Sequence, residues 1–184
     1  VLGGLATGTG AFDLGINVGP NQTAVVGGAT TLQNNGTLTL QSTASQSADS
    51  YLDFTGGLNA TAVEQTVLSG YLLAQNAPIS LNNVAVAGTG GAIVTTGSLT
   101  DPYNGSGGDI AINGLDMQGL NLTTLAGTNG STILTAATNL SAGTLNTLSG
   151  NLALGSGGTG ATLTATAEAN LAVAANYAIS IDAN

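Results

Sequence analysis

The sequence contains no lysine, no arginine, no histidine and no cysteine. Its nine acidic residues therefore have no basic side chain to pair with, and the formal net charge at pH 7 is −9. Because phosphate contacts need lysine or arginine, this composition argues against nucleic-acid binding and against electrostatic binding to an anionic membrane. Because cysteine is absent, the fold does not depend on disulfide bonds.

The same absences remove most catalytic chemistry. Catalytic triads need an imidazole, Schiff-base and P-loop chemistry need a lysine, and zinc sites favour histidine or cysteine. Pairs of carboxylates remain, as glycosidases use them, and the candidates are Asp49 with Asp53 and Asp109 with Asp116. No motif surrounds either pair, and aromatic residues make up only 3% of the chain. We therefore expect a protein that is not an enzyme and has no cofactor.

The first residue of the sequence and the lack of a long apolar run indicate a secreted protein. The sequence begins with Val1 and not with methionine, which we interpret as the removal of a leader peptide. No apolar run approaches the roughly 18 to 20 residues of a membrane-spanning helix. The 184 residues suit one domain, or one domain with a tail. We expect an extracellular or cell-surface protein without membrane insertion.

The pattern along the chain indicates β-structure. Short runs alternate between apolar and polar residues, as at 37–40, 84–87 and 109–112, and 29 glycines separate such runs. Asn-Gly pairs, which are strong hairpin signals, begin at Asn35, Asn104, Asn113 and Asn129.

Small aliphatic side chains and few aromatics favour a thin, two-layer β arrangement. The one candidate for a short helix is 61–75, where Val63, Val67 and Tyr71 lie on one helical face and Gly70 weakens the pattern. No fixed period of about 20 to 50 residues is visible, so a regular solenoid is not expected.

Both ends of the chain alternate in a way that suits a long strand. After an apolar, glycine-rich stretch at 1–10, the side chains of Phe12, Leu14, Ile16 and Val18 share one face, and Pro20 ends the run. Such a strand is either the first strand of the protein's own sheet or a strand that is donated to another chain. The alternation at 163–181 is too long for one ordinary strand, so this segment must bend, break or cross to another subunit.

Two further patterns concern ligands and modification. The turn-rich segment 101–109 offers Asp101, Asn104 and Asp109 as weak candidates for calcium ligands, although their spacing does not match an EF-hand. Seven of the 18 asparagines stand in Asn-x-Ser/Thr sequons, and each is a candidate for an N-glycan: Asn21, Asn35, Asn59, Asn104, Asn121, Asn129 and Asn139.

The apolar segment 1–18, the all-β body after Pro20 and the sequons together resemble strand-donating extracellular filament subunits of archaea, such as thread and bundling-pilus proteins. The resemblance implies a β-sandwich head, immunoglobulin-like or jelly-roll-like, that lacks a strand. Residues 1–19 would be the donor tail and residues 20–184 the head. The tail of one subunit would complete the head of the next, with Phe12, Leu14, Ile16 and Val18 as the donated side chains.

This resemblance implies a function for the chain. It would be the structural subunit of a glycosylated homopolymer, a pilus or thread that serves adhesion or biofilm formation. The alternative is a cell-surface adhesin or surface-layer module that does not polymerise, which an uneven β-solenoid packing of Thr-, Asn- and Gly-rich turns would suit.

Overall fold

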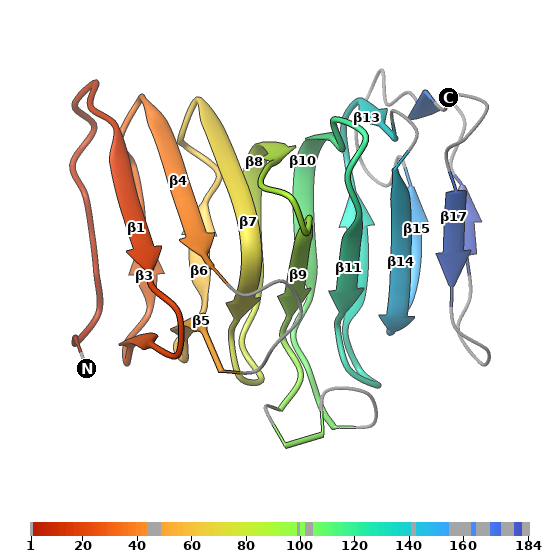
Figure 1. Cartoon of the computed structure of the whole chain (residues 1–184), viewed down its shortest axis with the longest axis horizontal. Helices are drawn as coiled ribbons and strands as arrows, with labels where there is room; N and C mark the ends of the chain where they lie inside the picture. The colour runs from red at the N-terminus through yellow and green to blue at the C-terminus, as the bar shows by residue number, and fades with distance from the viewer. Residues whose placement is uncertain are drawn as a thin grey trace.

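The chain folds as a parallel β-solenoid of about six turns (Figure 1). The computed structural model describes residues 2–43, 49–98, 100–101, 105–140, 143–154, 163–164, 170–173 and 179–181. The strand pairings within these residues are parallel, whereas a β-sandwich of the immunoglobulin or jelly-roll type packs two antiparallel sheets face to face. The all-β class is confirmed, and the β-sandwich is wrong.

Most of the 18 strands of the described residues are short, and none of these residues is helical. The strands are β1 (Leu14–Val18), β2 (Thr23–Val26), β3 (Thr30–Thr31), β4 (Thr37–Ser42), β5 (Tyr51–Phe54), β6 (Leu58–Ala60), β7 (Gln65–Leu73), β8 (Ile79–Val86), β9 (Ala92–Thr95), β10 (Ile110–Asp116), β11 (Leu122–Leu125), β12 (Ser131–Leu134), β13 (Thr138–Asn139), β14 (Thr144–Ser149), β15 (Asn151–Leu154), β16 (Leu163–Thr164), β17 (Asn170–Val173) and β18 (Ile179–Ile181).

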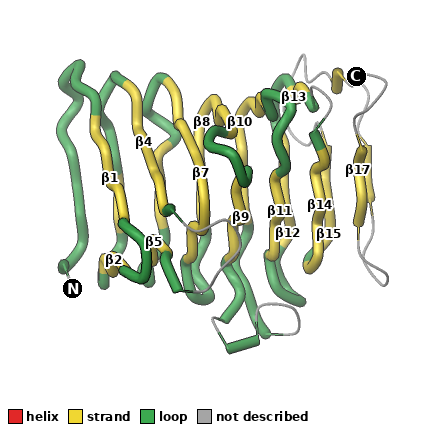
Figure 2. Tube along the Cα trace, viewed as in Figure 1, coloured by secondary structure: helices red, strands yellow, loops and turns green. Residues whose placement is uncertain are grey.

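Each turn of the coil adds one strand segment to each of three faces, and Figure 2 shows the strands of successive turns side by side. Face 1 is the ladder β1–β4–β7–β8–β10–β13–β16. Face 2 is β2–β5–β7–β9–β11–β14–β17. Face 3 is β3–β6–β8–β10–β12–β15–β18. The longer strands β7, β8 and β10 turn a corner of the coil, so each belongs to two faces.

The core lies inside the coil and is built from aligned small aliphatic side chains. On face 3, the parallel register stacks Leu58, Ile79, Ile110, Thr132 and Leu152 on one another. Each of these side chains is at most 2% exposed. Alternation along a strand sends every second residue inward, so each short alternating run supplies one layer of this core.

The turns of the coil differ in length, and this hides the repeat in the sequence. Hydrogen bonds between neighbouring turns join Asp13 to Thr37, which are 24 residues apart, Asn82 to Val63, 19 apart, and Asn113 to Asn82, 31 apart. Loops of unequal length leave the coil at its corners, while the strands keep their register except for one shift between Thr124 and Leu125, where β11 pairs with β14. The missing period therefore did not exclude a solenoid, and that expectation is wrong.

The Asn-Gly pairs mark corners of the coil and not hairpins. The pairs that begin at Asn35 and Asn129 directly precede β4 and β12, which are paired in parallel with their neighbours. The pair at Asn113 lies inside β10, where Gly114 has a φ of 89° and the strand passes from face 3 to face 1. Asn104 lies outside the described residues. The predicted hairpins are wrong, because glycine serves other purposes here: Gly114 supplies the left-handed residue of a bend, and a Cβ on Gly36 or Gly130 would overlap nearby backbone atoms.

The predicted helix at 61–75 is wrong as well. Strand β7 occupies most of this segment, and it bends at Gly70, whose φ is 76°. Its first part pairs with β4 on face 1 and its last part with β9 on face 2. The glycine that weakened the helical pattern is therefore the corner residue of a long strand.

The alternating segment 163–181 breaks into three strands. Its described parts are β16, β17 and β18, which pair with β13, β14 and β15 on three different faces. The rest of this segment lies outside the described residues. One turn of the coil therefore replaces the long single strand that the alternation suggested.

Candidate functional site

The predicted donor strand lies in the protein's own coil. Strand β1 pairs with β4, with Leu14 opposite Leu38. Leu14 and Ile16 are half-buried and Val18 is buried. Phe12 precedes the strand and is 44% exposed. In this structure the segment is thus the first strand of face 1, which is one of the two roles that the sequence left open.

The N-terminal end of the solenoid exposes apolar side chains. Leu2 is 63% and Phe12 44% exposed, and they are the exposed large hydrophobic residues of the described chain. Leu5, Leu14 and Ile16 are half-buried and pack against the core. We call these five residues the N-terminal apolar surface. A patch of this kind is typical of a contact with another element.

The backbone at this end has a strand neighbour on one side only. Within the described residues β1 pairs with β4 alone, and residues 2–7 reach the coil through isolated parallel bridges from Leu2 to Val26 and from Ala6 to Thr31. Residues 2–18 thus belong to the same coil as the strands that follow, with no break at residue 19. The outer edge of this first turn can accept a further parallel strand.

The opposite end of the solenoid has matching features. Leu171 and Val173 of β17 are half-buried, and in the described chain β17 pairs with β14 alone. Strands β1 and β17 lie toward opposite ends of the long axis (Figure 1). Because the ladders are parallel throughout, both ends present strands that run in the same direction around the coil.

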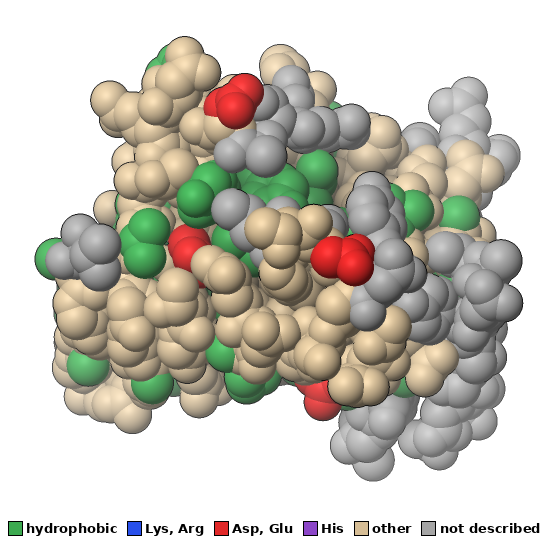
Figure 3. All heavy atoms as spheres, turned by 90° about the horizontal axis from the view of Figure 1, so that it is seen from below, with side chains coloured by type: hydrophobic (Ala, Val, Ile, Leu, Met, Phe, Trp, Pro, Cys, Tyr) green, Lys and Arg blue, Asp and Glu red, His purple; other side chains and the backbone are tan. Residues whose placement is uncertain are grey.

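The candidate catalytic carboxylates are not gathered in one open site. Asp53 is buried and Asp49 is exposed, while Asp109 directly precedes β10 at face 3 and Asp116 ends this strand on face 1. On the side of the molecule seen in Figure 3, the acidic side chains are scattered among uncharged ones. The described residues hold no group of three or more His, Cys, Asp or Glu side chains that could bind a metal ion.

Asp53, on β5, is only 3% exposed. Its Oδ2 accepts a hydrogen bond of 2.9 Å from Nε2 of Gln75, and its Oδ1 has no hydrogen-bond partner within the described residues. Burial raises the pKa of Asp53, because the charged form loses its hydration, and the bond from Gln75 offsets part of that rise.

The structure does not assemble the calcium candidates. Asp101 is exposed, and Asn104 lies outside the described residues. Oδ1 of Asp109 accepts a hydrogen bond of 2.9 Å from the backbone N–H of Ser131 in the next turn. The same hydrogen bond occurs at two other places. Oδ1 of Asp13 accepts from the backbone N–H of Thr37, and Oδ1 of Asn121 accepts from the backbone N–H of Thr144. The contact of Asp109 is therefore one of a recurring kind that joins successive turns.

The described sequon asparagines are distributed over the surface. The exposed ones are Asn21, Asn35, Asn59, Asn121 and Asn129. Asn139 is half-buried, and its Nδ2 donates to Oδ1 of Asp116 over 3.3 Å. N-glycans at these positions stay a prediction, and the accessible amides are those of the exposed group.

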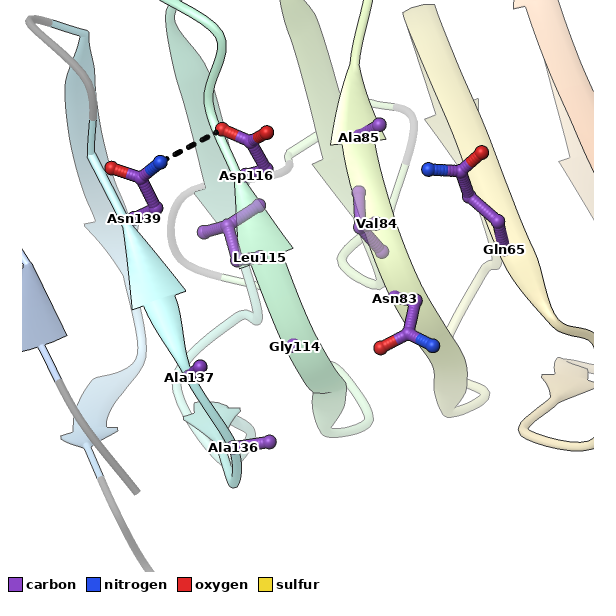
Figure 4. Close-up of a pocket in the computed structure, with 10 residues that line it drawn as sticks. All are labelled: Gln65, Asn83, Val84, Ala85, Gly114, Leu115, Asp116, Ala136, Ala137 and Asn139. Carbon is purple, nitrogen blue, oxygen red and sulfur yellow. Dashed lines mark hydrogen bonds between the residues drawn. The ribbon is translucent and has the colours of Figure 1, made fainter. Parts of the chain in front are cut away.

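A groove crosses face 1 from β7 to β13, and Figure 4 shows the residues that line it. Its volume is about 360 Å³. Small residues form its floor, namely Ala85 on β8, Gly114 on β10 and Ala137 next to β13. The complete lining is Gln65, Asn83, Val84, Ala85, Gly114, Leu115, Asp116, Ala136, Ala137 and Asn139.

Polar side chains border this floor. Asp116 and Asn139 lie together at one side of the groove, and Gln65 lies across from them on β7 (Figure 4). Nδ2 of Asn83 donates to the backbone oxygen of Glu64 over 2.8 Å. We call this site the face-1 groove. The sequence analysis missed it, because its residues come from separate turns and no motif joins them.

No family model, no curated protein and no solved structure matches the chain. In the described residues no helix is long and apolar enough to cross a membrane.

Proposed function

We propose that this chain is a structural subunit of an extracellular filament whose copies join head to tail through the ends of the solenoid. The observation that carries this proposal is the N-terminal apolar surface at the edge of the first turn. A second copy supplies a matching end with Leu171 and Val173, and its strands run in the direction that a parallel ladder requires.

This end-to-end contact between solenoids takes the place of the donor strand that the resemblance implied for a β-sandwich head. A strand added at a sheet edge gains main-chain hydrogen bonds, and burial of apolar side chains contributes about 25 cal/mol per Å². The two ends differ, so the contact is head-to-tail and propagates without closing. The β-ladders of one copy would continue into the next, so that strands about 4.8 Å apart are stacked along the whole axis of the filament.

The composition supports an extracellular structural role. The sequence without lysine or arginine gives trypsin-like proteases no site to cut, and it also lacks the histidine and cysteine that many catalytic sites use. Because each turn of a solenoid packs only on its neighbours, copies that join end to end would extend the coil into a rod. Adhesion or biofilm formation is the purpose that suits such a rod.

The test is assembly of the purified chain, followed by electron microscopy, sedimentation and fibre diffraction. We expect filaments with a reflection at about 4.8 Å along the axis. The double variant Leu2→Asp/Phe12→Asp should reduce the polymerised fraction at least tenfold, because it places charges on the N-terminal apolar surface.

The matched control is Asn59→Asp/Asn129→Asp, which adds the same two charges at exposed positions away from the ends. This control should assemble normally. Persistence of the intact chain as a monomer at high concentration would refute the filament and favour the alternative, a surface module that does not polymerise. Unchanged assembly of Leu2→Asp/Phe12→Asp would refute the proposed joint.

A further inference from the structure

We propose that the face-1 groove binds a neutral oligosaccharide. The groove lies on a side face of the coil, and its residues belong to β7, β8, β10, β13 and the corners between them. None of its lining residues belongs to the N-terminal apolar surface or to β17, so the groove is separate from the residues of the proposed filament joint.

The shape of the groove follows from the register. Val84 pairs with Thr66 on one side and with Leu115 on the other, and Leu115 pairs with Thr138. The outward residues next to these pairs are therefore aligned across four turns: Gln65, Asn83, Gly114 and Ala137. In the neighbouring outward row, Ala85 is followed by Asp116 and Asn139. The first row thus begins with the polar Gln65 and Asn83 and ends with the small Gly114 and Ala137, whereas the second row begins with the small Ala85 and ends with the polar Asp116 and Asn139.

The polar side chains keep hydrogen-bonding capacity for a ligand. Oδ1 of Asp116 accepts from Nδ2 of Asn139 and from the backbone N–H of Gln118, and its Oδ2 accepts no hydrogen bond within the described residues. Oδ1 of Asn83 and Oδ1 of Asn139 also accept none there. The amide of Gln65 is exposed and makes no hydrogen bond to the described residues.

This set of atoms selects a class of ligand. Most of the unused atoms are acceptors, which favour a ligand rich in O–H donors. The methyl groups of Ala85 and Ala137 offer an apolar floor for the C–H face of a sugar ring. Asp116 and the absence of any lysine, arginine or histidine disfavour anionic ligands.

The spacing suits a chain molecule. Neighbouring strands lie about 4.8 Å apart, so the four strand positions of the groove span roughly 14 Å along the axis of the solenoid. A volume of about 360 Å³ lies at the lower end of the range for ligand pockets. A short stretch of a linear neutral polysaccharide that runs along the axis would meet a polar side chain on successive turns.

The experiment measures binding of the intact chain to a panel of polysaccharides by affinity electrophoresis. The panel contains neutral mannan, starch and mixed-linkage glucan, with anionic pectate and cationic chitosan for comparison. Isothermal titration with the matching soluble oligosaccharides then gives the affinity. We expect binding to at least one neutral member and none to pectate.

Two variants locate the binding. Ala137→Leu fills the groove from an exposed position and should weaken binding at least tenfold, and Gln65→Ala should weaken it severalfold. Ala111→Leu makes the same change on face 3 and should bind like the unmodified chain. Thermal unfolding of each variant checks that the fold is kept.

Three outcomes would overturn the proposal. They are the absence of binding to every neutral polysaccharide, unchanged binding by Ala137→Leu with its fold intact, and binding restricted to chitosan. The last result would indicate that the carboxylate of Asp116 recognises a cation.

Discussion

Asp53 is the one acidic residue that is buried in the described part of the chain. The protein has no basic side chain to compensate it, and one of its oxygens lacks a hydrogen-bond partner there. A carboxylate in this position loses hydration without a counter-charge, which raises its pKa. Folding therefore shifts the protonation equilibrium of Asp53 towards the protonated form, relative to the unfolded chain.

We expect the variant Asp53→Asn to be more stable than the unmodified chain at pH 7 to 8. The stabilising effect of protonation is complete below the pKa of aspartate in the unfolded chain and is lost as pH rises through the higher pKa of the folded state. Urea unfolding of both proteins from pH 3 to pH 8 measures how the difference in stability between them depends on pH. The midpoint of the variant should exceed that of the unmodified chain at high pH, and the two should converge at pH 3.

The variant Asp13→Asn is not a suitable control, although Asp13 is exposed, because its carboxylate accepts a hydrogen bond from the backbone N–H of Thr37 in the next turn. Glu64→Gln is the better choice, since Glu64 is exposed and its carboxylate makes no hydrogen bond to the described residues, and the urea midpoint of this variant should stay close to that of the unmodified chain. A difference between Asp53→Asn and the unmodified chain that is constant with pH would contradict the role given to burial of the charge.

At the scale of the elements, the corners between strands decide whether one turn can stack on the next. Gly91 precedes β9 at the corner between faces 1 and 2, and its φ is 73°. A Cβ at this position would overlap the backbone carbonyl oxygen of Asn121 in the next turn. Both the backbone conformation and the close approach of the neighbouring turn require glycine here.

The variant Gly91→Ala should therefore lower the free energy of unfolding by about 2 to 4 kcal/mol, from the left-handed backbone and the overlap together. Gly8→Ala is the matched control, because nothing lies within 4 Å of a Cβ there. Its effect should stay within about 0.5 kcal/mol. Chemical denaturation of the two variants compares them, and equal stability would show that the turns can separate at this corner without cost.

The elements also show what the sequence could predict. The alternating runs at 37–40, 84–87 and 109–112 do lie in or beside β4, β8 and β10, because alternation reports which residues point inward. Alternation does not report which strand is the neighbour, or in which direction it runs. Asn-Gly pairs suit a hairpin and a solenoid corner alike, so antiparallel pairing was a natural and wrong inference.

The face-1 groove could not be predicted for the same reason. Gln65, Asn83, Gly114 and Ala137 become neighbours only through the parallel register, and unequal loops separate them in the sequence. The apolar character of the N-terminal segment was visible from Phe12, Leu14 and Ile16 alone. Its pairing with β4 was not, because an alternating strand fits its own sheet and a foreign one equally well.

At the scale of the whole molecule, the solenoid is a stack in which each turn contacts only its neighbours. Stability in such a stack is approximately a sum over turns and the interfaces between them. Turns in the middle have two neighbours and the turns at the ends have one. Local opening should therefore start at the ends, where the half-buried Leu14, Ile16, Leu171 and Val173 lie.

Two leucine truncations test this picture. Leu81, on β8 in the middle of the stack, is fully buried, and Leu81→Ala should cost about 2 to 5 kcal/mol of global stability. Leu171→Ala, on β17 at the end, should leave global stability almost unchanged and mainly promote opening of the last turn. Native-state hydrogen exchange separates the two effects, because amides of β7 to β11 should lose protection only in Leu81→Ala. Loss of protection across the whole coil in Leu171→Ala would show that the molecule unfolds as one cooperative unit, and that its ends are as firmly held as its centre.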